Sequence, residues 1–571
     1  MTNDTVPASN KHPATWLWQL LAPDRSFYRV AITYSLAISL LTLSVPIAVQ
    51  TLINTLANVA SIRAIIVLAI LLFLTLLVSG ALTALRTRTM EYFERRIYAR
   101  LTAEVSLHTI YARHEYFEGR RNTDITNRYF DIMTLQKNVP FLLVDGFALV
   151  LQMLVGFSLV SFYHPILLMF NIGVILALIL FWKLWGRSAV SSAVALSHAK
   201  YEMSKWLDSL AYAHEFFKST RHIDYAVERT DSLTNHYVSG HRKHFKYTFA
   251  QTISFLLLYA VASASLLGIG GWLVIIGQLS MGQLVAAELI LSAILFGLSK
   301  MADYLKNYYE MCGAADELGQ VFSIPQENID NSAKHALNGG ALVFDQVRLH
   351  DIHNTEYMFN FKIPANVKVL AHAEKSSTHR AIIHLLKRHT HPSSGSIQLA
   401  GCDLEDLDVY HLRQDVVVID RSPIVECSIE DYLRMSCPAV SLSEIRSVLK
   451  HVGIKEEVEN LPDGLKTLLS PLGDPLSPVS FLHLKLAACL LTQPKILVLT
   501  QFFDLLNPNV LEQTLSLVSK LPMTVLYFTK QVNHPIFDHR LLLEEKQQKL
   551  TSGNNASVNN DNTVLAGADN D

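Results

Sequence analysis

The first half of the chain contains six long apolar segments, which restrict the possible fold more than any other feature. They cover residues 28–54, 63–86, 137–162, 164–184, 247–276 and 283–302. Each approaches or exceeds the roughly 20 residues that an α-helix needs to cross a bilayer. A mean hydropathy of +0.25 over 571 residues is also high for a water-soluble protein. We therefore predict a polytopic α-helical membrane domain of six helices at residues 28–323, preceded by a polar segment at residues 1–27.

Basic residues are distributed unevenly between the segments that connect these spans. Arginine and lysine recur in the connections at 87–136 and 185–246, whereas the short connections on the opposite side contain only Arg63. Connections rich in basic residues stay on the cytoplasmic side of a membrane. We predict that the protein lies in a lipid bilayer with both termini in the cytoplasm.

The two basic connections have the pattern of helices. Residues 87–115 combine helical spacing with mixed charges and contain neither proline nor glycine, and residues 188–246 are similar apart from Gly240. We predict that the neighbouring spans continue through these residues as helices outside the membrane.

The second half of the chain has the pattern of a water-soluble domain. After a polar linker at 324–340, strand-like segments such as VKVLAHA (367–373) and KILVLT (495–500) alternate with helical segments. This alternation predicts an α/β sheet with helices on both faces, over residues 341–548. The final residues, 549–571, are rich in asparagine and poor in large apolar side chains, so we predict a disordered tail.

The net charge and the cysteine and histidine spacing argue against several classes of binding site. The net charge of -2 gives no indication of nucleic-acid binding. The five cysteines are scattered without CxxC spacing, which argues against a disulfide framework or a zinc site. Four histidines (His379, His384, His389 and His391) occur close together, but their spacing does not suit a metal ion, and we interpret them as solvated surface residues.

Several motifs of the second half resemble those of ABC transporters. HPSSGSIQLAG (391–401) is similar to the segment that follows the phosphate loop of an ABC nucleotide-binding domain. LPDGLKTLLSPLGDPLSPVSFLHLKLAACLLTQPKILVLT (461–500) is similar to the block from the signature motif to the Walker B strand, without a gap. With the six spans, they resemble an ABC exporter half-transporter of the type I secretion kind. The resemblance implies a P-loop-like ABC domain, a location in the bacterial inner membrane and a dimer, formed with itself or with another ABC half-transporter.

The residues that handle nucleotide in such domains are replaced in this chain. A phosphate loop needs glycines for backbone approach, a lysine for the phosphate charge and a hydroxyl for magnesium. The resemblance places this loop at 373–380, where the glycine positions are Ala373 and Thr378, the lysine position is His379 and the hydroxyl position is Arg380.

The other nucleotide motifs are replaced as well. By the same resemblance, the Walker B aspartate is Thr500 and the catalytic glutamate is Gln501, neither of which carries the required negative charge. In the signature motif, Pro478 lacks an N–H group and Val479 hinders backbone approach. The signature keeps its serine as Ser477, whereas the glutamine of the Q-loop is replaced by Arg421 and the switch histidine by Lys530.

These replacements lead to a prediction about function. Loss of the general base alone lowers a catalytic rate by orders of magnitude. We therefore predict an exporter-like membrane transport protein that does not hydrolyse ATP, and we expect no cofactor unless the altered site still binds ATP and magnesium. The alternatives are a non-transporting scaffold or regulator, and an ordinary ATP-driven exporter with a divergent site. Membrane-fusion or other secretion components are possible partners, and nucleic acid is not.

Three polar residues within the spans are candidates for a transmembrane cavity. Glu288 is an ionisable group in the sixth span, where it must face protein or water. Gln50 and Asn54 lie in the first span. The alternative for all three is pairing with polar neighbours or close packing between helices.

Overall fold

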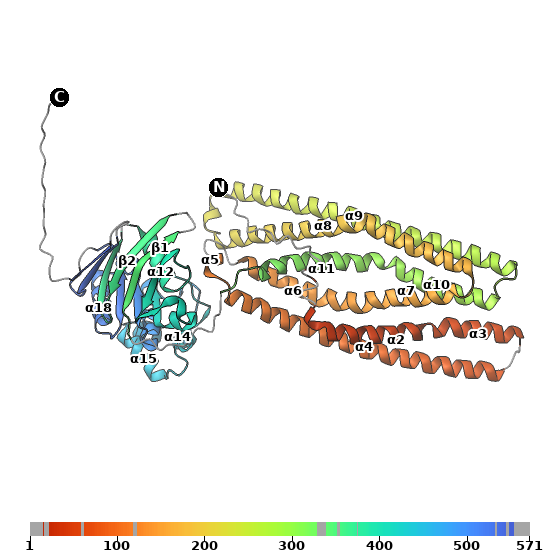
Figure 1. Ribbon diagram of the computed structural model, residues 1–571, viewed down its shortest axis with the longest axis horizontal. Helices are drawn as coiled ribbons and strands as arrows, with labels where there is room; N and C mark the ends of the chain where they lie inside the picture. The colour runs from red at the N-terminus through yellow and green to blue at the C-terminus, as the bar shows by residue number, and fades with distance from the viewer. Residues whose placement is uncertain are drawn as a thin grey trace, which may run out of the picture. The chain divides into compact units, whose positions relative to one another are not determined.

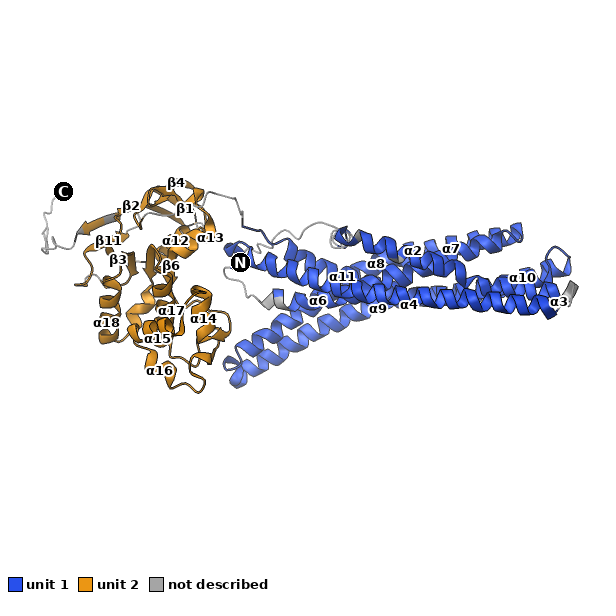
Figure 2. Ribbon diagram, turned by 90° about the horizontal axis from the view of Figure 1, so that it is seen from below, with its two compact units in different colours: residues 1–327 blue, residues 328–571 orange. Residues whose placement is uncertain are grey.

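The computed structural model describes residues 15, 17, 22–58, 62–117, 123–327, 339–350, 355–373, 375–531, 534–543 and 548–552. The chain divides into two compact units, residues 1–327 and 328–571 (Figure 2). This division falls within the predicted linker at 324–340. We call the two parts unit 1 and unit 2 and describe each by itself.

Unit 1 is helical. Its described residues include six helical stretches that are long and apolar enough to cross a membrane. The elements of unit 1 are η1 (Ala22–Asp24), α2 (Arg25–Thr42), α3 (Ser44–Asn58), α4 (Ile62–Ile110), α5 (His114–Phe117), α6 (Thr123–Phe141), the π-helical η2 (Leu142–Gly146), α7 (Phe147–Ser161), α8 (Pro165–Tyr212), η3 (Phe216–Lys218), α9 (Thr220–Ile275), α10 (Met281–Ser299) and α11 (Met301–Phe322).

Three helices of unit 1 are much longer than a bilayer requires. The helix α4 has 49 residues, α8 has 48 and α9 has 56. At 1.5 Å per residue each is more than about 70 Å long, over twice the roughly 30 Å hydrocarbon thickness of a membrane. The prediction that the spans continue as helices through the basic connections is therefore confirmed, and Figure 1 shows α8 and α9 side by side along their length.

Small residues allow the helices of unit 1 to pack closely. A Cβ atom added at Gly156 of α7 would lie 2.4 Å from the Cδ1 atom of Ile294 on α10. A Cβ atom added at Gly297 of α10 would lie 2.3 Å from Leu149 on α7. Glycine at helix contacts is typical of membrane proteins, where dispersion contacts replace the hydrophobic effect between helices.

Unit 2 is an α/β domain. Its strands form a six-stranded sheet in the order β12-β11-β3-β10-β9-β6, a four-stranded sheet in the order β2-β1-β4-β5, and the pair β7-β8. The strands are β1 (Leu342–His350), β2 (Glu356–Ile363), β3 (Lys368–Ala373), β4 (Ser394–Leu399), β5 (Cys402–Asp403), β6 (Val416–Ile419), β7 (Cys427–Ser428), β8 (Leu468–Leu469), β9 (Ile496–Leu499), β10 (Thr524–Phe528), β11 (His539–Leu543) and β12 (Gln548–Ser552).

The helices of unit 2 lie between these strands in the chain. They are α12 (Ser376–Leu386), η4 (Leu404–Asp406), α13 (Val409–Asp415), α14 (Ile429–Ser436), α15 (Leu442–His451), α16 (Lys455–Glu459), η5 (Gly464–Lys466), α17 (Pro478–Thr492), η6 (Gln501–Leu505) and α18 (Pro508–Ser519). The predicted start of the tail at residue 549 falls inside β12, and residues 553–571 lie outside the described part of the chain.

The large sheet of unit 2 is buried on both faces. Along β9, Leu497 and Leu499 belong to one apolar core, and Ile496 and Val498 belong to the other. The strands β3, β10, β9 and β6 are parallel, and parallel strands require cover on both faces. The predicted α/β sheet is confirmed. Because parallel strands end at the same edge, the ends of β3, β9 and β10 bring several predicted site residues together.

Candidate nucleotide site

The connection at the predicted phosphate loop is short. Ala373 is the last residue of β3 and is buried, and Ser376 is the first residue of α12. Residues 374 and 375 alone separate the strand from the helix, and residue 374 lies outside the described part of the chain. Thr378, His379 and Arg380 are therefore inside α12 rather than in a loop. The backbone N–H group of Thr378 donates a hydrogen bond to the carbonyl oxygen of Lys375 over 3.1 Å.

His379, at the lysine position, is part of the apolar interior. Its ring stacks on that of Phe528 from β10, with centroids 4.4 Å apart and an interplanar angle of 27°. The side chain is buried, and neither ring nitrogen has a hydrogen-bond partner among the described residues. Burial lowers the pKa of His379 to about 4, with nearby His372 acting in the same direction and Asp504 opposing it. His379 is thus neutral at pH 7. The interpretation of this residue as solvated surface is wrong, because the first turn of α12 directs it onto β10.

The side chains at the two predicted Walker B positions form hydrogen bonds with other residues of the chain. Thr500 follows β9 and is buried, and its hydroxyl donates to the carbonyl oxygen of Ile419 in β6 over 2.9 Å. The side-chain oxygen of Gln501 accepts a hydrogen bond from the hydroxyl of Ser376 over 3.2 Å. Arg380 is exposed on α12.

Asp504 is a central polar residue at this edge of the sheet, and the sequence analysis missed it. Its carboxylate accepts hydrogen bonds from the Tyr527 hydroxyl, from the Thr529 hydroxyl at 2.7 Å and from the backbone N–H of Lys530 at 3.1 Å. Asp504 therefore ties the turn after β9 to the end of β10. The Lys530 side chain, at the switch position, is exposed. An acid just after a buried strand was the available signal in the sequence.

The signature position is the N-terminus of α17. The Ser477 hydroxyl caps this helix by accepting a hydrogen bond from the backbone N–H of Ser480 over 3.1 Å, and Pro478 and Val479 occupy its first turn. The carboxylate of Glu457, from α16, accepts a hydrogen bond from the Ser480 hydroxyl and lies 3.5 Å from the backbone nitrogen of Ser477. Because helix N-termini attract anions, a residue of the chain itself occupies the anion position of α17. The sequence analysis did not identify Glu457.

The Q-loop position is also fixed by internal contacts. The guanidinium of Arg421 lies over the ring of Phe502, 5.5 Å from its centroid. The ammonium of the buried Lys485 in α17 donates to the carbonyl oxygens of Asp420 and Ser422 at 2.9 and 2.6 Å. Burial lowers the pKa of Lys485, and nearby Asp420 opposes that shift. The loop around Arg421 is thus attached to α17 by a buried cation.

The candidate cavity residues of the membrane spans lie at helix contacts. The Gln50 side-chain oxygen accepts a hydrogen bond from the Tyr163 hydroxyl over 2.8 Å. A Cβ atom added at Gly282 of α10 would lie 2.4 Å from the Asn54 side-chain oxygen. Glu288 accepts a hydrogen bond from the Ser292 hydroxyl over 3.1 Å, while its other oxygen is buried and has no hydrogen-bond partner among the described residues. For Gln50 and Asn54 these contacts agree with the helix-packing alternative.

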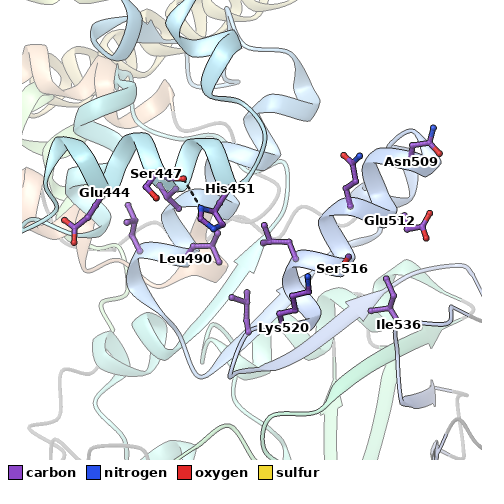
Figure 3. Close-up of a pocket in the computed structure, with 14 residues that line it drawn as sticks. Glu444, Ser447, His451, Leu490, Asn509, Glu512, Ser516, Lys520 and Ile536 are labelled. Carbon is purple, nitrogen blue, oxygen red and sulfur yellow. Dashed lines mark hydrogen bonds between the residues drawn. The ribbon is translucent and has the colours of Figure 1, made fainter.

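A separate hollow lies elsewhere in unit 2 (Figure 3). It has a volume of about 1200 Å³ and lies between α15, the end of α17, and α18. Its lining includes Glu444, His451, Leu490, Glu512 and Lys520, and none of the predicted nucleotide residues. Within the described ranges, no group of three or more His, Cys, Asp or Glu residues could hold a metal ion.

Comparison with known proteins identifies the membrane part of the chain. Residues 29–299 match the ABC transporter transmembrane region. Unit 1 is an ABC transporter transmembrane domain. The whole chain is similar to a solved bacterial Atm1-family ABC exporter with ATP bound, with a TM-score of 0.75 and 18% identity, over 92% of this chain and 95% of that one. The predicted ABC exporter fold and family resemblance are confirmed.

Curated relatives match nearly all of this chain. The leukotoxin translocation ATP-binding protein LktB of Bibersteinia trehalosi is 22% identical over 559 residues, which covers 95% of this chain and 78% of LktB. The toxin RTX-I translocation ATP-binding protein of Actinobacillus pleuropneumoniae is 22% identical over 563 residues, with the same coverage.

Proposed function

We propose that this protein is a subunit of an ABC-type export or secretion system and that its unit 2 does not hydrolyse ATP. The observation that carries the proposal is the environment of His379. A phosphate-binding site needs a cation at this position, and here a neutral imidazole is packed against Phe528. The relatives named for toxin translocation support the assignment to export.

The other positions support the same proposal. ATP with magnesium requires anionic oxygen ligands and a general base, and Thr500 and Gln501 supply neither. The Thr500 hydroxyl already donates a hydrogen bond to the carbonyl oxygen of Ile419, and the side-chain oxygen of Gln501 already accepts one from the Ser376 hydroxyl. At the signature, the Glu457 carboxylate would repel the phosphate of a partner subunit. The residues present therefore do not fit a magnesium–nucleotide complex.

The proposal extends to membrane orientation and partners. The basic connections favour cytoplasmic termini in a bacterial inner membrane. We expect a dimer of this chain with itself or with another ABC half-transporter, together with secretion components.

The test is ATP binding and hydrolysis by the purified full-length protein in lipid, with and without magnesium. It is measured beside a variant with His379→Lys, Arg380→Ser and Gln501→Glu. We expect neither binding nor turnover by the natural protein. Magnesium-dependent turnover would overturn the proposal and favour an ordinary ATP-driven exporter. Isolation of the protein from its native membrane then separates the two inactive alternatives, because a transport subunit should co-purify with an intact ABC subunit or a membrane-fusion component, and a scaffold need not.

A further inference from the structure

Unit 1 contains a cluster of charged side chains where three helices meet outside the predicted membrane spans. The carboxylates of Asp131 on α6 and Glu317 on α11 are buried, each with 3% exposure of the side chain. Asp131 is 3.2 Å from the ammonium of Lys200 on α8 and also accepts a hydrogen bond from Tyr201. Glu317 is 3.3 Å from the guanidinium of Arg128 on α6. These contacts hold α6, α8 and α11 together.

His198 of α8 extends this cluster, because its imidazole faces Glu317 and the neighbouring Asp316 on α11. Its Nε2 atom is 2.9 Å from a carboxylate oxygen of Asp316 and 3.6 Å from one of Glu317. The His198 side chain is 48% exposed, whereas that of Asp316 is 21% exposed. Water can therefore deliver a proton to the imidazole, while the carboxylates that would stabilise the proton are mostly shielded.

With all three carboxylates ionised, the charges of the cluster balance when His198 carries that proton. Asp131, Asp316 and Glu317 can supply three negative charges, and Arg128 and Lys200 supply two permanent positive charges. The third positive charge can come only from a protonated His198 among these six groups. Arg128 is the cation of α6 that acts on His198 against protonation. The helix α9 also packs along α8, where its Gly240 lies against Leu196.

We propose that His198, Asp316 and Glu317 form a proton-binding site that links α8 to α11. The hydrogen bond to Asp316 raises the pKa of His198, burial opposes this shift, and the charges of Glu317 and Asp316 add to the rise. A group whose folded pKa is raised contributes its full stabilisation below the unfolded value, here 6.5, and loses it as pH rises through the folded value. The link between α8 and α11 is therefore closed in mildly acidic solution and loosens at pH above 6.5.

The test is hydrogen exchange of the full-length protein in lipid nanodiscs between pH 6 and pH 8, corrected for the intrinsic exchange rate. The peptides of interest cover residues 195–205 of α8 and 309–320 of α11. The variants are His198→Gln, which cannot be charged, His198→Lys, which is always charged, and Asp316→Asn. The control is His236→Gln, a change of an exposed histidine on α9.

We expect protection of both peptides in the natural protein to be about threefold to tenfold higher at pH 6 than at pH 8. His198→Gln and Asp316→Asn should abolish this dependence, His198→Lys should hold protection at its pH 6 level throughout, and His236→Gln should behave like the natural protein. Equal protection at both pH values in the natural protein, or unchanged pH dependence in His198→Gln, would overturn the proposal. The result does not depend on ATP hydrolysis, so it stands or falls separately from the proposed function.

Discussion

The hydroxyl of Ser376 donates a hydrogen bond to the side-chain oxygen of Gln501 over 3.2 Å. This contact joins the first residue of α12 to the residue that follows Thr500 at the end of β9. By the resemblance to ABC domains, the start of α12 belongs to the predicted phosphate loop and Gln501 is at the predicted catalytic-base position. The two positions thus contact one another directly, through neutral groups.

Restoring the catalytic carboxylate alone should not restore catalysis. We expect Gln501→Glu to show no ATP turnover, because Thr500 provides no charge for magnesium and His379 is not available as a cation. Phosphate release by the full-length protein in lipid measures this. A matched Gln501→Ala variant controls for loss of the Ser376 contact. Magnesium-dependent release by Gln501→Glu above that control would contradict the prediction.

Removal of the Asp504 carboxylate should destabilise unit 2. Asp504→Ala removes the acceptor of the hydroxyls of the buried Tyr527 and Thr529 and of the Lys530 N–H. The expected loss is about 2–4 kcal/mol of unfolding free energy, seen as a lower apparent melting temperature. Asp463→Ala, at an exposed position, is the control and should change little. Equal melting temperatures for the two variants would show that the Asp504 contacts are energetically unimportant.

His379 should make unit 2 sensitive to acid. Because its pKa falls from 6.5 to about 4 on folding, the unfolded chain takes up the proton first, and stability declines as pH falls from about 6.5 towards 4. At pH 5 the cost is about 2 kcal/mol. His379→Phe keeps the ring against Phe528 and removes the proton site. Thermal melting at pH 7 and pH 5 should show that lowering the pH reduces the melting temperature of this variant less than that of the natural protein. His451→Gln, at an exposed histidine of α15, should give no such gain.

Glu457 should stabilise the start of α17. Glu457→Gln keeps an acceptor for the Ser480 hydroxyl but removes the negative charge at the helix N-terminus, at an expected cost of about 1 kcal/mol. Glu457→Lys should cost more, because it places a positive charge there. Hydrogen exchange of residues 477–485 reports the change. The control is Glu459→Gln, on the same short helix, whose carboxylate pairs with Lys455 at 3.7 Å instead. If both glutamine variants exchange alike, Glu457 has no special role.

Gly282 should be essential for the contact between α3 and α10. A Cβ atom at this position would lie 2.4 Å from the Asn54 side-chain oxygen and 3.2 Å from the Gln50 carbonyl oxygen. Gly282→Ala should lower the apparent melting temperature of the full-length protein in lipid, and adding Asn54→Ala should recover part of the loss. Gly80→Ala, where no atom lies within 4 Å of an added Cβ, should be neutral. Additive effects of the two changes would contradict this arrangement.

The sequence by itself determined the two-part architecture. Six apolar segments of sufficient length predict six helical spans, since a chain in lipid must satisfy its backbone hydrogen bonds internally. The alternation of strands and helices predicts the sheet of unit 2 in the same local way. The positions predicted for nucleotide handling, such as Thr500 and His379, could also be assigned from the sequence, because the surrounding motifs resemble those of ABC domains.

Only the tertiary structure decided which contacts these residues make. The Thr500 hydroxyl donates a hydrogen bond to Ile419, which is 81 positions away in the chain. Glu457 reaches the start of α17 from a neighbouring helix, and Asp504 joins the ends of β9 and β10. His198 meets Asp316 across 118 positions. Local periodicity carries no information about such pairs, because each depends on how distant elements pack and where their side chains then point.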